Sequence, residues 1–450
     1  MLDIVVIILY ALGMLALGWL GLHKAKSREG YLVAGRRLGP GMYVGTLSAV
    51  ILGGASTVGT IRIGYVYGIS GVWLCGALGI GIIVLSLFLT GPLTQFKLYT
   101  VTELFERRYN RSARKAGALV MLAYDVMIAV TSTIAIGTLA ETALHVPAPL
   151  AIVLGGVLVL AYSAMGGMWS LTLTDIVQFI IMTIGILILM LPVTIHQAGG
   201  WDTVVARAHP GAFSPTAIGS GTIVTYFVIY GLGVLIGQDV WQRVFTARSV
   251  KVARIAGGLA GVYCILYGIV GALIGVVASV MVPGLDDPDQ AFVQLLEVAV
   301  PSGLRGLLMA AALAAMMSTS SSALLAASTL VSEDLLGATR FNRHRLWTII
   351  MGVVVTLLSL MITDVMSALT VAYDLLVGGM LVPLLATLFF PRTRTLAAVA
   401  GMAAGILLVV VFMLKDGLAA NSPVYAGLIA NAVVMLGGSL CCRPQPAAQD

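Results

Sequence analysis

The chain has 450 residues, of which 59% are hydrophobic and only 10% are charged, and its formal net charge is +6. A soluble protein of this length needs far more charge to cover its surface. The composition therefore excludes a soluble protein and predicts a polytopic membrane protein. The 52 glycines agree with this class, because glycine is more frequent in membrane helices than in soluble ones.

Taken in chain order, windows of about 20 apolar residues predict thirteen membrane spans. The first lacks a basic start and a small-residue cleavage site, so we expect a retained helix there rather than a signal peptide. No soluble domain interrupts the series. The predicted spans are 3–22, 42–67, 71–95, 116–142, 148–166, 172–195, 220–240, 255–282, 303–331, 347–363, 366–390, 395–414 and 424–441.

Lysine and arginine are concentrated in alternate loops between these spans. The loops after the first, third, seventh, ninth and eleventh spans, with the C-terminal tail, hold 21 of the 25 basic residues. Because cytoplasmic loops carry the excess of Lys and Arg, the N-terminus is predicted outside and the C-terminus in the cytoplasm of the cell (inner) membrane. The same bias explains the positive net charge, so no nucleic-acid partner is expected.

The second and seventh spans are poorly suited to continuous helices. The second contains Gly53, Gly54 and Gly59, and the seventh contains three glycines just before a polar Gln-Asp pair at 238–239. The two spans lie five spans apart, as the first helices of two inverted five-helix repeats would. Interrupted helices at matching positions indicate a transporter site near the bilayer midplane. The alternative is that the glycines only allow close helix packing.

The ninth span contains five consecutive hydroxyl residues, 318–322. On a helix, Ser318, Ser321 and Ser322 share one face, with Thr319 beside it. Hydroxyl and carbonyl oxygens are the hard, neutral ligands that suit a small alkali cation, so this face predicts an ion site. The alternative is that the hydroxyls bond to the preceding turn and hold helices together.

Asp175 lies about one turn inside the otherwise apolar sixth span. A charged group at the centre of a membrane helix costs roughly 2.5–3.5 kcal/mol on insertion scales. The carboxylate is therefore expected to face the bundle interior and to find a positive partner, which a bound cation would supply.

Three sequence elements carry a resemblance to a known family: "GGMWSLTLTD", "GQDVWQR" and "AAMMSTSSSALLAASTLVSEDL". With the thirteen spans, they resemble the sodium/solute symporter family, whose members include proline, galactose, sialic acid and pantothenate transporters. The resemblance implies an all-α membrane protein with a leucine-transporter-like inverted repeat of five plus five helices. It would comprise an extra helix 3–22, repeats 42–195 and 220–390, and two extra helices within 395–441.

The resemblance also implies sodium ligands. A main site would use the carbonyls of Ala49, Leu52 and Ala315 with the hydroxyls of Ser318 and Thr319. A second sodium site, found in some members, would be formed here by Asp175, Ser318, Ser321 and Ser322.

Seven positions are implied to lie near the solute: Ile51, Gly53, Ser56, Cys75, Gln238, Trp241 and Asp374. Sugar transporters of the family place long polar side chains at positions like Ser56 and Cys75, so a sugar is disfavoured. Asp374 resembles an acidic residue of the choline-transporter branch and favours an amine-bearing or zwitterionic solute. For Trp241, core packing is an equally good interpretation.

Three charged residues receive no site role: Arg62, Asp125 and Asp239. We expect Arg62 to extend its charge toward the outer membrane surface, with pairing to Asp125 or to Asp374 as alternatives.

The function predicted from the sequence is sodium-coupled uptake of a small organic solute by alternating access, with sodium as the coupling ion. The expected partners are the solute and the lipid bilayer, and the protein is expected to act as a monomer. Two alternatives stay open, a proton-coupled symporter of a small carboxylate and a transport-deficient solute sensor of the same fold. An enzyme is disfavoured, because the five histidines lie at loops or span ends and no nucleophile elbow or phosphate loop occurs.

Overall fold

The computed structural model describes residues 2–94, 96–337, 341–362, 364–390, 393–418 and 420–440. Within these ranges every named secondary-structure element is a helix, which confirms the all-α prediction. In the N-terminal half the helices are α1 (Leu2–Lys24), α2 (Arg28–Val33), α3 (Pro40–Ile51), α4 (Thr60–Tyr67), α5 (Val72–Val84), α6 (Thr90–Thr94), α7 (Glu103–Arg108), α8 (Arg111–Leu144), α9 (Ala148–Gly166), α10 (Met168–Met182), α11 (Leu191–Gln197) and α12 (Trp201–Arg207).

The C-terminal half continues the same pattern. Its helices are α13 (Ser220–Tyr226), α14 (Gln238–Val244), α15 (Val250–Met281), α16 (Ala291–Ala299), α17 (Leu304–Thr329), α18 (Phe341–Ser359), α19 (Val365–Phe389), α20 (Thr395–Asp416) and α21 (Ser422–Leu440). In the described part of the chain, ten helices are long and apolar enough to cross a membrane, so the predicted count of thirteen is not confirmed. The last residue of the thirteenth predicted span, 441, lies outside the described ranges.

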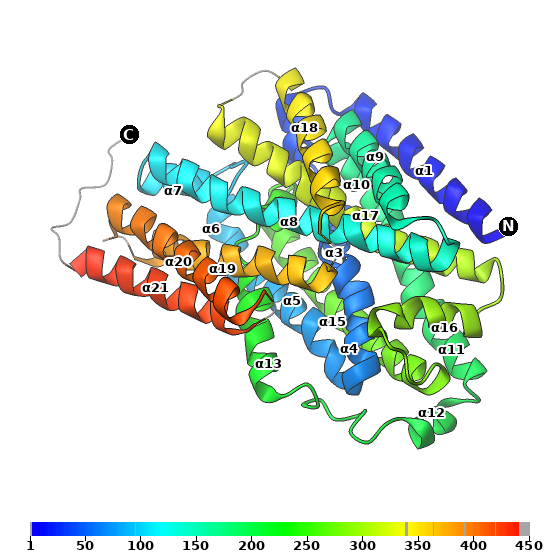
Figure 1. Cartoon of the computed structure of the whole chain (residues 1–450). Coiled ribbons are helices and arrows are strands. Elements are labelled where there is room, and N and C mark those ends of the chain that lie inside the picture. Colours follow the sequence, from blue (N-terminus) through cyan, green and yellow to red (C-terminus); the bar gives the residue numbers. More distant parts are fainter. Residues whose placement is uncertain are drawn as a thin grey trace.

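The bundle is built around α17, in which every residue from Leu308 to Thr329 is buried. The long helix α8 packs against α17, while α15 packs against α5, α4 and α3 (Figure 1). Helix α1 covers α9 and α10 and leaves much of its apolar surface outward, as a lipid-facing helix does. At one edge α20 and α21 lie side by side against α19 (Figure 1).

The predicted second span is divided, as its glycines indicate. Helix α3 ends at Ile51, and Leu52 adopts φ −89° and ψ 68°, which no helix contains. A Cβ on Gly53 would stand 2.7 Å from the Thr319 Oγ1 atom, and one on Gly54 would stand 2.6 Å from the Ala135 Cβ atom. Only glycine permits this approach to α17 and α8.

The predicted seventh span is divided as well. Helix α13 passes through a π-helical turn, Phe227–Gly231, and the chain then bends before α14 begins at Gln238. A Cβ on Gly233 would stand 2.4 Å from the Tyr373 ring, so this glycine is also needed for a close approach. Residues of both interruptions line one cavity.

Candidate functional site

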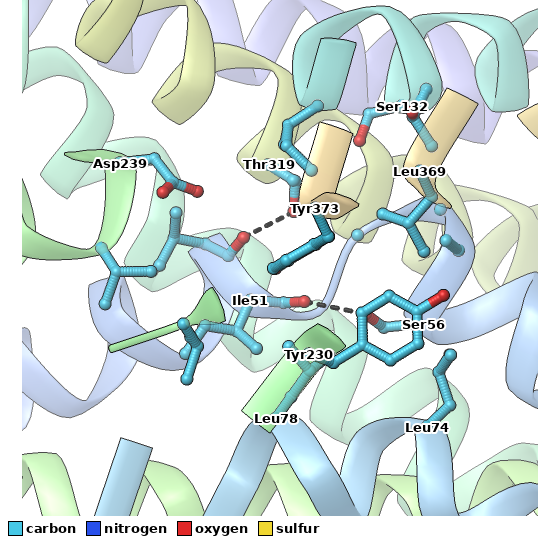
Figure 2. Close-up of a pocket in the computed structure, with 18 residues that line it drawn as sticks. Ile51, Ser56, Leu74, Leu78, Ser132, Tyr230, Asp239, Thr319, Leu369 and Tyr373 are labelled. Atoms are coloured by element: carbon cyan, nitrogen blue, oxygen red, sulfur yellow. Dashed lines mark hydrogen bonds between the residues drawn. The ribbon is translucent and has the colours of Figure 1, made fainter. Parts of the chain in front are cut away.

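A small cavity of about 30 Å³ lies where the two divided spans approach α17, α8, α5 and α19 (Figure 2). We call it the central pocket. Its walls are mainly apolar, with hydroxyl groups and one carboxylate among them. The lining residues are Val50, Ile51, Gly53, Gly54, Ala55, Ser56, Leu74, Leu78, Ile128, Thr131, Ser132, Tyr230, Val234, Asp239, Val240, Thr319, Leu369 and Tyr373.

Three of the seven predicted solute positions line the central pocket: Ile51, Gly53 and Ser56. The Ser56 hydroxyl donates to the Ile51 carbonyl oxygen at 2.8 Å, across the end of α3 (Figure 2). Because α3 is interrupted here, the Ile51 carbonyl oxygen lacks the backbone N–H that would bond it inside a continuous helix. The Ser56 hydroxyl takes the place of that donor.

The other four predicted solute positions lie outside the pocket lining. The Cys75 thiol, behind the wall, donates to the Ser56 carbonyl oxygen at 3.3 Å. The Gln238 side chain bonds to the backbone of Tyr99 and Val101, and the buried Trp241 indole donates to the Leu235 carbonyl oxygen at 2.7 Å. These two side chains hold the fold together, as the core-packing interpretation of Trp241 predicted.

The fourth of these residues, Asp374, is fully buried on α19. Among the described residues, neither of its carboxylate oxygens has a hydrogen-bond partner. No salt bridge in the described ranges joins it to Arg62.

The sequence analysis missed the carboxylate that does line the pocket, Asp239. It lies in the first turn of α14, is 3% exposed, and accepts a hydrogen bond from the Tyr124 hydroxyl at 3.4 Å. In Figure 2 it faces the pocket from the side opposite to Ser132. The fully buried Asp125 lies close to Asp239. Asp239 directly follows Gln238, so the glycine interruption indicated the correct segment but not the correct side chain.

Aromatic rings form a wall beside this carboxylate. The rings of Tyr230 and Tyr373 meet edge to face with centroids 5.1 Å apart, and Tyr373 meets Tyr124 in the same way at 5.2 Å. Aromatic faces attract cationic groups, so these rings and Asp239 favour the same kind of ligand.

The oxygens predicted for the main sodium site converge next to the central pocket. The Ser318 hydroxyl donates to the Ala49 carbonyl at 2.8 Å and to the Ala315 carbonyl at 2.9 Å. The Thr319 hydroxyl donates to the Val50 carbonyl at 2.8 Å (Figure 2). Leu52, the fifth predicted ligand, is the first non-helical residue after α3.

This oxygen set is neutral and hard, and it is drawn from the end of α3 and from α17. It suits a small alkali cation, provided that the hydroxyl hydrogens turn away from the carbonyls they now bond. A cation there would take the place of hydrogen bonds between α17 and the end of α3, so ion binding and helix contact share the same atoms.

The four residues of the predicted second sodium site also meet, but a cationic side chain lies among them. Arg243 Nη2 is 3.2 Å from Asp175 Oδ2 and also bonds the Ser322 hydroxyl. The side chains of Arg243 and Asp175 are fully buried. Ser321 and Ser322 both donate to the Ser318 carbonyl, as the alternative interpretation of the hydroxyl run predicted. The 21 basic residues that the sequence assigns to the loops include Arg243, and this assignment is wrong because Arg243 is fully buried in α14.

At the end of the bundle predicted to face outward, a second cavity of about 140 Å³ contains three carboxylates: Asp287, Asp289 and Asp364. We call it the outer pocket. Arg62 pairs with Asp289 at 3.0 Å. Arg62 is 38% exposed at this end, so its extension toward the outer surface stays a prediction, whereas the alternative pairings with Asp125 and Asp374 are corrected to Asp289. Burial raises the pKa of the Asp289 carboxyl; Arg62 opposes this shift, and Asp287 and Asp364 add to it.

At the opposite, predicted inner end, charged groups tie several segments together. Arg28 makes a two-point ion pair with Glu333, and His344 lies 3.3 Å from the same carboxylate. Arg114 pairs with Asp334 at 2.5 Å. We call these five side chains the inner latch, because they join α2, α8 and α18 to the segment that follows α17.

Comparisons with known proteins identify the family and the fold of the chain. The sequence model of the sodium:solute symporter family matches residues 31–405. The chain is 24% identical to the sodium/glucose cotransporter of Vibrio parahaemolyticus, over 90% of this chain and 83% of that one. It is 25% identical to the osmoregulated proline transporter OpuE of Bacillus subtilis, over 88% and 86%.

A solved structure supplies the matching fold. It is the substrate-bound, outward-open state of a Na⁺-coupled sialic acid symporter, which aligns with a TM-score of 0.86 at 18% identity. The alignment covers 100% of this chain and 99% of that one. The likeness confirms the leucine-transporter-like fold, whereas the exact bounds of the two repeats stay a prediction.

Proposed function

Because the chain belongs to the sodium:solute symporter family, we propose that it couples sodium entry to the uptake of a small amine-bearing or zwitterionic solute by alternating access. The chain is a membrane transporter and not an enzyme. The names of two relatives that it matches mention very different solutes, a sugar in one and an amino acid in the other. Family membership therefore supports sodium-coupled uptake, and the solute class has to be argued from the pocket.

Asp239 carries the argument for the solute. It is the carboxylate that lines the central pocket; within the described ranges the nearby Arg243 interacts with it electrostatically but lies beyond ion-pair distance. An ionised carboxylate without a positive partner is costly in a buried, apolar setting. A solute ammonium group would supply that partner, and the faces of Tyr230 and Tyr373 would add a further attraction.

The same pocket disfavours the two other solute classes. A polyhydroxylated sugar needs many polar partners, whereas most of the lining is aliphatic or aromatic. A simple carboxylate would meet Asp239 as a like charge, which argues against the open alternative of a small carboxylate. The amine preference first argued from Asp374 is thus proposed again, with a different residue as its anchor.

The outer pocket supports the same solute class. Its described lining contains three carboxylates and no cationic side chain, and Arg62, outside the lining, pairs with one of them, Asp289, so the outer pocket carries a negative excess. A cleft with one sign of charge raises the local concentration of ligands of the opposite sign. Cations, including sodium and amines, would be drawn toward this entrance.

The experiment is a binding and uptake screen with the purified protein in liposomes under an inward sodium gradient. Amines, amino acids, sugars and monocarboxylates are compared in the wild type, Asp239→Asn and Asp374→Asn. We expect amines or amino acids to be taken up, and Asp239→Asn to lose this uptake by tenfold or more while keeping its response to sodium.

Asp374→Asn is the matched control, because Asp374 is equally buried yet lies outside the pocket lining. It should keep the solute preference of the wild type. Best uptake of an uncharged sugar, or full amine uptake by Asp239→Asn, would refute the proposed solute class.

A further inference from the structure

We propose that Arg243 is a built-in cation at the place of the second sodium ion, so that this chain binds one sodium ion and not two. The inference rests on the proposed sodium coupling and deepens it by fixing the number of ions. It starts from a disagreement between the residues that the family resemblance implied and the contacts that the structure shows.

The guanidinium contacts half of the predicted ligand set. Its Nη2 atom contacts the Asp175 carboxylate at 3.2 Å and bonds the Ser322 hydroxyl, so one nitrogen contacts two of the four predicted ligands. The other two ligands belong to the same turn of α17, where Ser321 bonds the Ser318 carbonyl at 3.0 Å. A sodium ion at this position would have to share the carboxylate with the guanidinium.

Charge balance excludes that sharing. Asp175 and Arg243 are both fully buried, and one carboxylate neutralises one cation. Asp239 also interacts electrostatically with Arg243, but it lies beyond ion-pair distance, and the proposed solute ammonium would balance its charge. A sodium ion added beside the Asp175–Arg243 pair would therefore leave an uncompensated positive charge in a buried site. The guanidinium cannot release its charge by losing a proton at any pH that the protein meets. The Arg243 side chain therefore keeps its positive charge beside Asp175 at every such pH.

The local fold keeps the guanidinium there. Arg243 lies in α14, which is only seven residues long and packs against α3 and α17. The same Asp175 Oδ2 atom also accepts a hydrogen bond from the Thr46 hydroxyl of α3, while Oδ1 has no hydrogen-bond partner among the described residues. A guanidinium moving off Asp175 would break contacts to two helices at once.

The main site is unaffected by this arrangement. Its carbonyl and hydroxyl oxygens carry no charge and have no cationic side chain among them in the described structure. One ion can bind there beside α3 while Arg243 supplies the positive charge one turn further along α17. The expected stoichiometry is one sodium ion per chain.

The test is a count of bound ions. Purified full-length protein is equilibrated with ²²Na⁺ at constant ionic strength in potassium chloride, and the ions bound per chain at saturation are measured. We expect one in the wild type and one in Arg243→Lys. We expect two in Arg243→Gln, where Asp175 and the Ser322 hydroxyl have lost their guanidinium partner.

Two further variants keep the test decisive if Arg243→Gln does not fold. Ser318→Ala with Thr319→Ala should reduce the wild-type count from one to zero. The pair Asp175→Asn with Arg243→Gln removes both buried charges together and should keep a count of one.

The outcomes separate the inference from the proposed function. Two ions in the wild type, an ion left in the Ser318→Ala/Thr319→Ala protein, or a single ion in a folded Arg243→Gln protein would each overturn the inference. A wild type that binds no sodium would instead overturn the proposed sodium coupling.

Discussion

At the residue scale, the buried pair of Asp175 and Arg243 should behave as a unit whose halves cannot be removed singly. Asp175→Asn leaves a guanidinium with full charge in the bundle interior. Breaking a buried pair in this way costs about 3–5 kcal/mol, so we expect a large fall in the melting temperature of the detergent-solubilised protein. Adding Arg243→Gln should restore part of the loss. Equal melting temperatures for the single variant and the wild type would contradict the pairing.

A second prediction at this scale concerns Gly53, where the end of α3 meets α17. A Cβ in Gly53→Ala would stand 2.7 Å from Thr319 Oγ1 and would displace a hydroxyl of the predicted main sodium site. Overpacking of this kind typically costs about 1–3 kcal/mol, and about 1.4 kcal/mol is a factor of ten in affinity. Sodium affinity should therefore fall about tenfold, as measured by ²²Na⁺ titration. Gly13→Ala is the control, because no atom lies within 4 Å of a Cβ there.

At the scale of elements, the sequence predicted the features that follow from residue type. Glycine clusters indicated both interrupted spans, because only glycine permits the approach of Gly53 to Thr319. The hydroxyl run indicated the oxygens that meet the Ala49 carbonyl. The face that α14 turns inward could not be predicted, since it depends on the bend that precedes the helix. For that reason the sequence indicates Gln238 as a solute contact, whereas Asp239 is the residue that lines the central pocket.

The same limit explains the error at Arg243. Counting positive charges along the chain assigns a residue near the end of a span to the loop that follows. It carries no information on whether the side chain folds back to a buried carboxylate. Asp175 was predicted to need a positive partner, and the partner came from a helix 68 residues further along the chain.

The inner latch gives a prediction for how elements move. Glu333 receives two hydrogen bonds from Arg28 and lies beside His344, so Glu333→Gln removes the charge that holds α2 and α18 against the end of α17. We expect faster amide hydrogen exchange over Arg28–Val33, because closure of this end becomes less favourable. Glu29→Gln is the matched control: Glu29 is 48% exposed and pairs with Arg36, and surface pairs of this kind contribute little. Equal exchange in both variants would show that the latch does not hold this end closed.

At the scale of the whole molecule, the two ends of the bundle differ in how they are closed. At the inner end the carboxylates of Glu333 and Asp334 are buried and pair with partly exposed arginines. The outer end contains a cavity of about 140 Å³ whose ion pair, Arg62 to Asp289, is more than one-third exposed on both sides. Surface pairs of this kind are weak. Starting from the conformation in the structure, the outer end of the bundle should therefore open more easily than the inner end.

This asymmetry makes the outer end sensitive to pH in a definite direction. Burial raises the pKa of Asp289, which Arg62 opposes and Asp287 and Asp364 reinforce, so the folded arrangement holds a proton there more tightly than the unfolded chain does. Stability from this proton is fully present below the ordinary pKa of about 3.9 and is lost as the pH rises through the raised value. We expect the melting temperature of the wild type to fall more steeply with rising pH over this window than that of Asp289→Asn. Parallel profiles for the two proteins would show that Asp289 does not govern the pH response of the outer pocket.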